Sequence, residues 1–109
     1  MPLRKPSESE IKLIAFMAKN VNHALPADWS ETILVNNMDD GGTGSLTIQY
    51  ADGKTYEQRR FGRELSEYTF KDKDRLLVTV TLNLDEDDNL YELDIWKVDF
   101  SSVIAYPEL

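Results

Sequence analysis

One stretch of ten residues, 75–84, restricts the fold more than any other part of the chain. Its apolar side chains fall on alternate positions, which is the spacing of a β-strand with one buried face. The predicted buried face carries Leu76, Val78, Val80, Leu82 and Leu84, and the other face carries Leu77, Thr79, Thr81 and Asn83. A strand of this kind needs neighbouring strands and a layer that covers its apolar side.

The covering layer is predicted close to the N-terminus. Ser7 and Glu10 have the spacing of a capping box, in which two side chains satisfy the free N–H groups at the start of a helix. Apolar residues then recur at helical spacing as far as Val21. We therefore expect one helix over about residues 7–22, with its apolar stripe on the sheet.

Further strands are predicted at residues 32–36, 45–50, 55–61 and 90–100, with an extended stretch from Leu65 to Phe70 beyond Gly62. Asp52-Gly53 is typical of a type I′ turn and predicts a hairpin between the second and third strands. Apolar residues in the last strand do not keep to one face, which indicates a β-bulge or cover on both faces. The apolar tail, residues 101–109, is expected to pack back on the domain, and Trp29 to plug the core edge. The chain is predicted to be a single α+β domain, residues 1–109, with one N-terminal helix packed on an antiparallel sheet of about five strands.

The composition excludes several classes of function. A formal net charge of −8 opposes binding to nucleic acids and to anionic membranes. The chain has no cysteine, which excludes disulfides, thiolate nucleophiles and cysteine-ligated metals and fits a reducing compartment. Neither a signal peptide nor a run long enough to span a bilayer is recognisable, so we expect a cytoplasmic protein.

Acidic residues are concentrated near the C-terminus. Residues 85–109 hold eight of the 20 acids and one of the 12 bases, Lys97. This surface either keeps the protein soluble or attracts a basic protein partner. Asp85, Asp87 and Asn89 have the first spacings of a calcium loop, but Leu90 and Trp96 stand where that loop needs Gly and Glu, so no metal site is expected. Glu92 and Asp94 share one strand face, as either an exposed polar pair or a pair for acid–base chemistry.

A glycine-rich loop joins the first two predicted strands. It contains Asp39, Asp40, Gly41, Gly42, Thr43, Gly44 and Ser45. A phosphate-binding loop needs a helix behind its glycines and usually a lysine, whereas here a strand follows and two acids precede. The loop is therefore interpreted as a connection that uses positive φ angles, or as a contact loop for a partner or ligand.

Two stretches resemble a known family. Residues 38–46 are similar to an Asp-Gly-Gly-Met-Gly-Ser-Leu signature, and residues 92–100, Glu-Leu-Asp-Ile-Trp-Lys-Val-Asp-Phe, are similar to the closing signature of the same family. That family consists of small, mostly bacterial proteins described as a domain of unknown function. The likeness covers nearly the whole chain, with Thr43 in place of the usual Met, which would remove an apolar anchor from the loop. The resemblance implies no known activity and no catalytic residues.

Two hypotheses of function follow, and neither assigns a catalytic residue, a cofactor or a metal. The first is a non-enzymatic protein-binding module, for example an immunity-like protein that covers a basic toxin with its acidic 85–99 hairpin and its glycine-rich loop. The alternative is a small-ligand-binding protein or an enzyme with a site at the glycine-rich loop. A homodimer formed through the sheet edges is a further expectation. The candidate binding residues are Asp39, Asp40, Gly41, Gly42, Gly44, Ser45, Asp85, Asp87, Glu92, Asp94 and Trp96.

Overall fold

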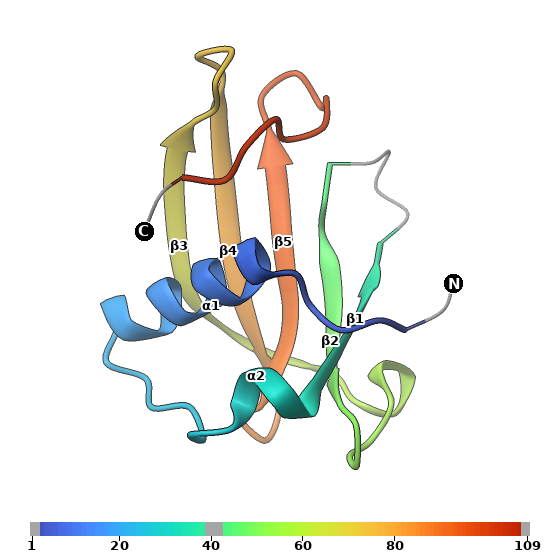
Figure 1. The fold of residues 1–109 in the computed structure, drawn as a ribbon. Coiled ribbons are helices and arrows are strands. Elements are labelled where there is room, and N and C mark those ends of the chain that lie inside the picture. Colours follow the sequence, from blue (N-terminus) through green and yellow to red (C-terminus); the bar gives the residue numbers. More distant parts are fainter. Residues whose placement is uncertain (1–2, 39–42, 108–109) are drawn as a thin grey trace.

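The computed structural model describes residues 3–38 and 43–107, which form a five-stranded antiparallel sheet with one long helix against one face (Figure 1). The elements are α1 (Glu8–Asn20), α2 (Trp29–Thr32), β1 (Ile33–Asn37), β2 (Leu46–Tyr50), the 3-10 helix η1 (Tyr56–Gln58), β3 (Phe61–Lys71), β4 (Leu77–Asp85) and β5 (Leu90–Lys97). The predicted α+β class, one N-terminal helix on an antiparallel sheet of about five strands, is confirmed. Within the described ranges no helix has the length and apolar character needed to cross a membrane.

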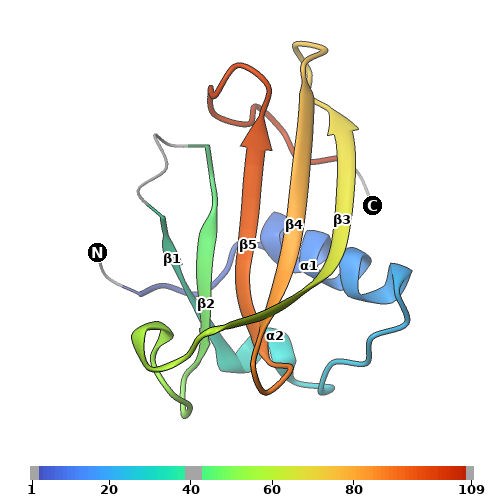
Figure 2. The ribbon, with the colours of Figure 1, turned by 180° about the vertical axis from the view of Figure 1, so that it is seen from behind.

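The strands lie in the order β1-β2-β5-β4-β3. A β1–β2 hairpin is joined to a β3-β4-β5 meander through pairing of β2 with β5. The predicted hairpin at Asp52-Gly53 is therefore wrong, because the free edge of β2 is occupied by β5. The chain instead crosses the sheet on the side away from α1, in front of β5 and β4, to reach the far edge, and η1 replaces the predicted third strand (Figure 2).

The core lies between α1 and the inner face of the sheet. Ser7 caps α1 with the predicted capping box: its Oγ accepts from the Glu10 N–H, and the Glu10 carboxylate accepts from the Ser7 N–H. The helix buries Leu13, Ile14 and Met17. The strands contribute Ile33, Val35, Leu46, Ile48, Val78, Val80, Leu82, Leu93 and Ile95. Trp29 packs half-buried against this cluster, as predicted.

The ends of β5 differ from each other. A register shift opposite Asn83 and Leu84 gives a β-bulge near the start of β5, which is one of the two alternatives predicted. At the other end the strand stops at Lys97, and residues 98–100, which were predicted to continue it, form a turn. The tail then packs back on the core through Val103 and Tyr106, as expected.

Gly62, at the start of β3, lies against the backbone at the end of β4. A Cβ atom added there would lie 2.1 Å from the backbone oxygen of Asp85 and 2.9 Å from the Glu86 nitrogen. Because backbone atoms cannot move aside cheaply, we expect Gly62→Ala to lower the free energy of unfolding by about 1–3 kcal/mol in urea denaturation. Gly53→Ala is the control, since its nearest neighbour, Tyr50 Cβ, lies at 3.3 Å. Equal stability losses in the two variants would contradict the close approach.

Candidate functional site

The sheet face opposite α1 is the leading candidate, and we call it the open face. Directly paired residues in antiparallel strands point to the same side of a sheet. The pairs Asn83–Glu92, Thr81–Asp94 and Thr79–Trp96 join β4 to β5, and Glu64–Asn83 and Glu67–Thr81 join β3 to β4. These side chains alternate with the buried ones that face the core. By the same rule the open face includes Thr47 of β2, Glu64, Glu67, Thr69 and Lys71 of β3, Leu77, Thr79, Thr81 and Asn83 of β4, and Glu92, Asp94 and Trp96 of β5.

Four carboxylates form an acidic row across the open face: Glu64, Glu67, Glu92 and Asp94. The Asn83 amide donates to Glu92 Oε1 at 3.3 Å and to Asp94 Oδ2 at 2.9 Å. The Tyr56 hydroxyl donates to Glu92 Oε2, and burial together with this bond raises the pKa of Tyr56, so the phenol stays a donor. Both donors are neutral, so they fix Glu92 and Asp94 without neutralising them. In the described part of the chain, Glu64, Glu67 and Glu92 form no ion pair.

An apolar patch borders the acidic row at the end of β5. It consists of Leu77, Trp96, Val98 and Phe100, of which Trp96 is 47% and Phe100 69% exposed. The two rings meet edge to face with centroids 6.1 Å apart. The turn is fixed by bonds from Val98 N–H to Leu77 O and from Phe100 N–H to Lys97 O. Large aromatic side chains held in such exposed positions are typical of protein contact surfaces.

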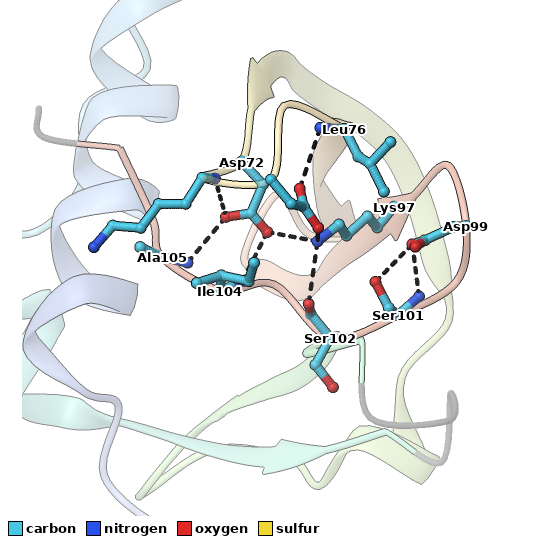
Figure 3. Close-up of polar contacts among 10 residues, drawn as sticks. Asp72, Leu76, Lys97, Asp99, Ser101, Ser102, Ile104 and Ala105 are labelled. Atoms are coloured by element: carbon cyan, nitrogen blue, oxygen red, sulfur yellow. Dashed lines mark hydrogen bonds and ion pairs between the residues drawn. The ribbon is translucent and has the colours of Figure 1, made fainter.

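A buried ion cluster fastens the tail behind this patch (Figure 3). Lys97 occupies a core-facing position in β5, and its Nζ donates to Asp72 at 2.9 Å, to Asp74 at 2.6 Å and to the Ser102 carbonyl at 3.4 Å. Asp72 also accepts from the backbone N–H groups of Lys73, Ile104 and Ala105. The side chains of Lys97 and Asp72 have no exposed surface, so the cluster is structural rather than a reactive amine open to substrate.

The charges in this cluster predict a loss of stability in acid. Burial alone would raise the pKa of Asp72, but the Ile104 N–H and the Lys97 ammonium outweigh burial and lower it. Burial would also raise the pKa of Glu10, but the hydrogen bonds from the Arg4 guanidinium outweigh burial and lower this pKa. A carboxylate whose pKa is lower when folded stabilises the fold above its unfolded pKa, and the benefit disappears as pH falls. We expect the melting temperature to drop steeply below about pH 4, and an Asp72→Asn variant to lose less between pH 5 and pH 2, as measured by circular dichroism. An equal drop in the variant would contradict this assignment.

The described end of the glycine-rich loop joins β2 to β5. Ser45 Oγ accepts from the Ile95 N–H at 2.8 Å and donates to the Ile95 carbonyl at 3.2 Å, so a side chain replaces a ladder pair. Gly44 has φ of 117°, and a Cβ there would lie 3.2 Å from the Tyr106 hydroxyl, so the position favours glycine. Thr43 is buried, at the position where the resembling signature has Met. Asp39, Asp40, Gly41 and Gly42 lie outside the described residues.

The acidic turn is not part of the open face. Asp85 is 2% exposed, and its carboxylate accepts from the N–H groups of Asp87 and Asn89 and from Arg59 Nη1. The calcium-like spacing is therefore that of a turn closed by its own aspartate. Among the described residues, no group of three or more His, Asp or Glu side chains could hold a metal. Of the candidates in the 85–99 hairpin, Glu92, Asp94 and Trp96 share one face, whereas Asp85 and Asp87 lie in the turn beyond Glu92, at the opposite end of β5 from Trp96.

A pocket of about 480 Å³ lies elsewhere, beyond the C-terminal end of α1. Its lining includes Lys19, His23, Leu25 and Trp29. It is open to solvent and shares no residue with the open face or with the described part of the glycine-rich loop. The small-ligand hypothesis placed its site at that loop, and this pocket does not support it.

Sequence reasoning missed several residues of the open face. Glu64 and Glu67 were not selected, and the predicted pairing of residues 45–50 with residues 55–61 did not place them beside Glu92 and Asp94. Asn83 was assigned to the outer face of its strand, but its bridge between two carboxylates requires the β4–β5 register. A signal for the buried cluster was present, because Lys97 stands two residues after Ile95, on the apolar side of β5.

Residues 3–107 match a family described as a domain of unknown function, DUF6984. The chain belongs to this family. The expected membership in a family of unknown function is confirmed. The match covers the open face, the glycine-rich loop and the tail as far as Pro107. Searches among curated proteins and among solved structures gave no match.

Proposed function

We propose that this protein is a non-enzymatic protein-binding module that holds a basic protein partner on its open face. The observation that carries this proposal is the exposed Trp96–Phe100 pair beside four carboxylates on the sheet face opposite α1, where Glu64 and Glu67 are exposed and Glu92 and Asp94 are half-buried. Tryptophan is among the side chains that contribute most to protein interfaces. The acidic row supplies the complementary potential that accelerates association with a basic surface and excludes acidic ones.

The geometry supports a partner of protein size. Small-molecule sites enclose their ligands in concave pockets, whereas these side chains come from three adjacent strands on a sheet surface. Glu92 and Asp94 are held by Asn83 and Tyr56 before any partner arrives, so these two side chains lose little entropy on binding. The cysteine-free composition supports a reducing compartment such as the cytoplasm.

Selection from a peptide display library on the immobilised protein tests the proposal. The expected peptides are rich in Arg or Lys and contain an aromatic or aliphatic residue. Their affinity should fall about 30-fold for Trp96→Ala, the loss typical of an interface hot spot. It should also fall for Glu92→Gln with Asp94→Asn, and it should weaken as salt rises.

The matched control is Asp87→Asn with Asp88→Asn, which removes the same charge from the exposed turn at the far end of the hairpin. Binding that falls with the turn variant and ignores Trp96→Ala would reject the open face and return the site to the acidic turn. Selection of acidic or uncharged peptides would reject the basic partner.

A further inference from the structure

The open face restricts the shape of what it can bind, and this inference rests on the proposed function. β4 and β5 are interior strands, and their backbone groups are paired with neighbours on both sides. A partner cannot add a strand beside Glu92, Asp94 or Trp96, because strand addition requires a free edge and the free edge on this side belongs to β3, two strands away from β5. It has to lie on top of the sheet, as α1 does on the other face, and a helix is the element that packs on a sheet face in this way.

The spacing along β5 agrees with the spacing along a helix. Alternate strand residues are about 6.7 Å apart, so Asp94 and Glu92 lie about 7 and 13 Å from Trp96 along the strand. Helix positions i+4 and i+8 lie about 6 and 12 Å from position i on nearly the same side. A helix that runs along β5 with an apolar residue over Trp96 would therefore place its next two facing residues over Asp94 and Glu92.

Each of those two positions faces a pair of carboxylates. Glu67 lies across Thr81 from Asp94, and Glu64 lies across Asn83 from Glu92. Strands two apart are separated by about 9.6 Å, so a long basic side chain between them can interact with both acids. We propose that the partner segment is an amphipathic helix with an apolar residue at one position and Lys or Arg at the fourth and eighth positions from it.

Labelled synthetic helices test this inference by fluorescence anisotropy. The patterned peptide, of about 18 residues so that a helix can form, carries Trp with Arg at the fourth and eighth positions from it; a second version has the order reversed. A control of identical composition places the Arg residues two and six positions away, on the other side of the helix. A third peptide has alternating Val and Thr with Arg two and four positions from Trp, as in an extended strand.

Of the two patterned helices, the one that binds more tightly is expected to have an affinity at least about tenfold above that of the control, because the control cannot form the two charge interactions. The advantage should vanish with Glu92→Gln plus Asp94→Asn and persist with Asp87→Asn plus Asp88→Asn. Equal affinity of patterned and control helices, or an advantage that survives the Glu92 and Asp94 changes, would overturn the helix. Tighter, Trp96-dependent binding of the extended peptide would overturn the helix and leave the proposed function standing. Circular dichroism confirms that each protein variant is folded.

Discussion

Asp72→Asn is expected to lower the melting temperature by about 10–15 °C at pH 7, as removal of one partner from a buried ion pair does. Asp72 is the point at which β3, β5 and the tail are held together, since it accepts from Lys97 and from the N–H groups of Ile104 and Ala105. An amide of the same shape brings an NH₂ group into a site where every neighbour is already a donor. Hydrogen exchange should show loss of protection at the amides of Ile104 and Ala105.

Asp74→Asn is the matched control for this result. Asp74 also binds Lys97, but the Asp74 side chain is 34% exposed, so water can supply hydrogen bonds in place of the lost carboxylate oxygen. We expect its melting temperature to fall by only about 2–5 °C, with the tail still protected. A larger loss from Asp74→Asn than from Asp72→Asn would show that the tail is not what the cluster holds.

Arg59→Met is expected to lower the free energy of unfolding by about 3 kcal/mol, as measured by urea denaturation. The ladder between β2 and β5 is short, and Arg59 extends the junction by donating to the Ile48 carbonyl of β2 and the Leu90 carbonyl of β5. Its Nη1 also binds the buried Asp85 at 3.0 Å. Methionine keeps the packing of the stem over Tyr91 but leaves a buried carboxylate and two carbonyls without this donor.

Arg63→Met removes a comparable ion pair at the surface. Arg63 and Asp88 are 3.2 Å apart, with side chains 52% and 62% exposed, so the loss should stay below about 1 kcal/mol. If both variants lost the same stability, Arg59 would be an ordinary surface arginine rather than the link between the two strands.

Local patterns in the sequence predicted the elements that are determined by residues close to one another along the chain. The capping box of Ser7 and Glu10 begins α1 as expected, and the alternation from Leu76 to Leu84 gives β4. The mixed apolar pattern of residues 90–100 allowed a bulge or cover on both faces; a bulge lies near Tyr91, whereas Trp96, Val98 and Phe100 are exposed at the other end of the strand. These features depend on contacts within one strand or one helical turn, so the residues themselves specify them.

Strand order depended on contacts that the sequence pattern does not contain. Asp52-Gly53 is a turn, but its strands do not pair, because Arg59 and Ser45 direct β2 toward β5 instead. The same error hid the acidic row, since Glu64 and Glu67 reach the open face only through the β3–β4 register. Asp85 was selected as a surface acid, although Arg59, distant in sequence, makes it a buried one.

The central claim is that the open face binds the partner, and mapping by NMR tests it most directly. Two-dimensional nitrogen–proton spectra would be recorded while the best peptide from the display selection is titrated into labelled protein. We predict that the largest shift changes occur at the Trp96 indole and at the amides of Leu77, Asp94 and Phe100. Changes centred on the turn at Asp87 and Asp88, on the pocket around His23 and Trp29, or on Gly44 and Ser45 would contradict the open face as the binding site.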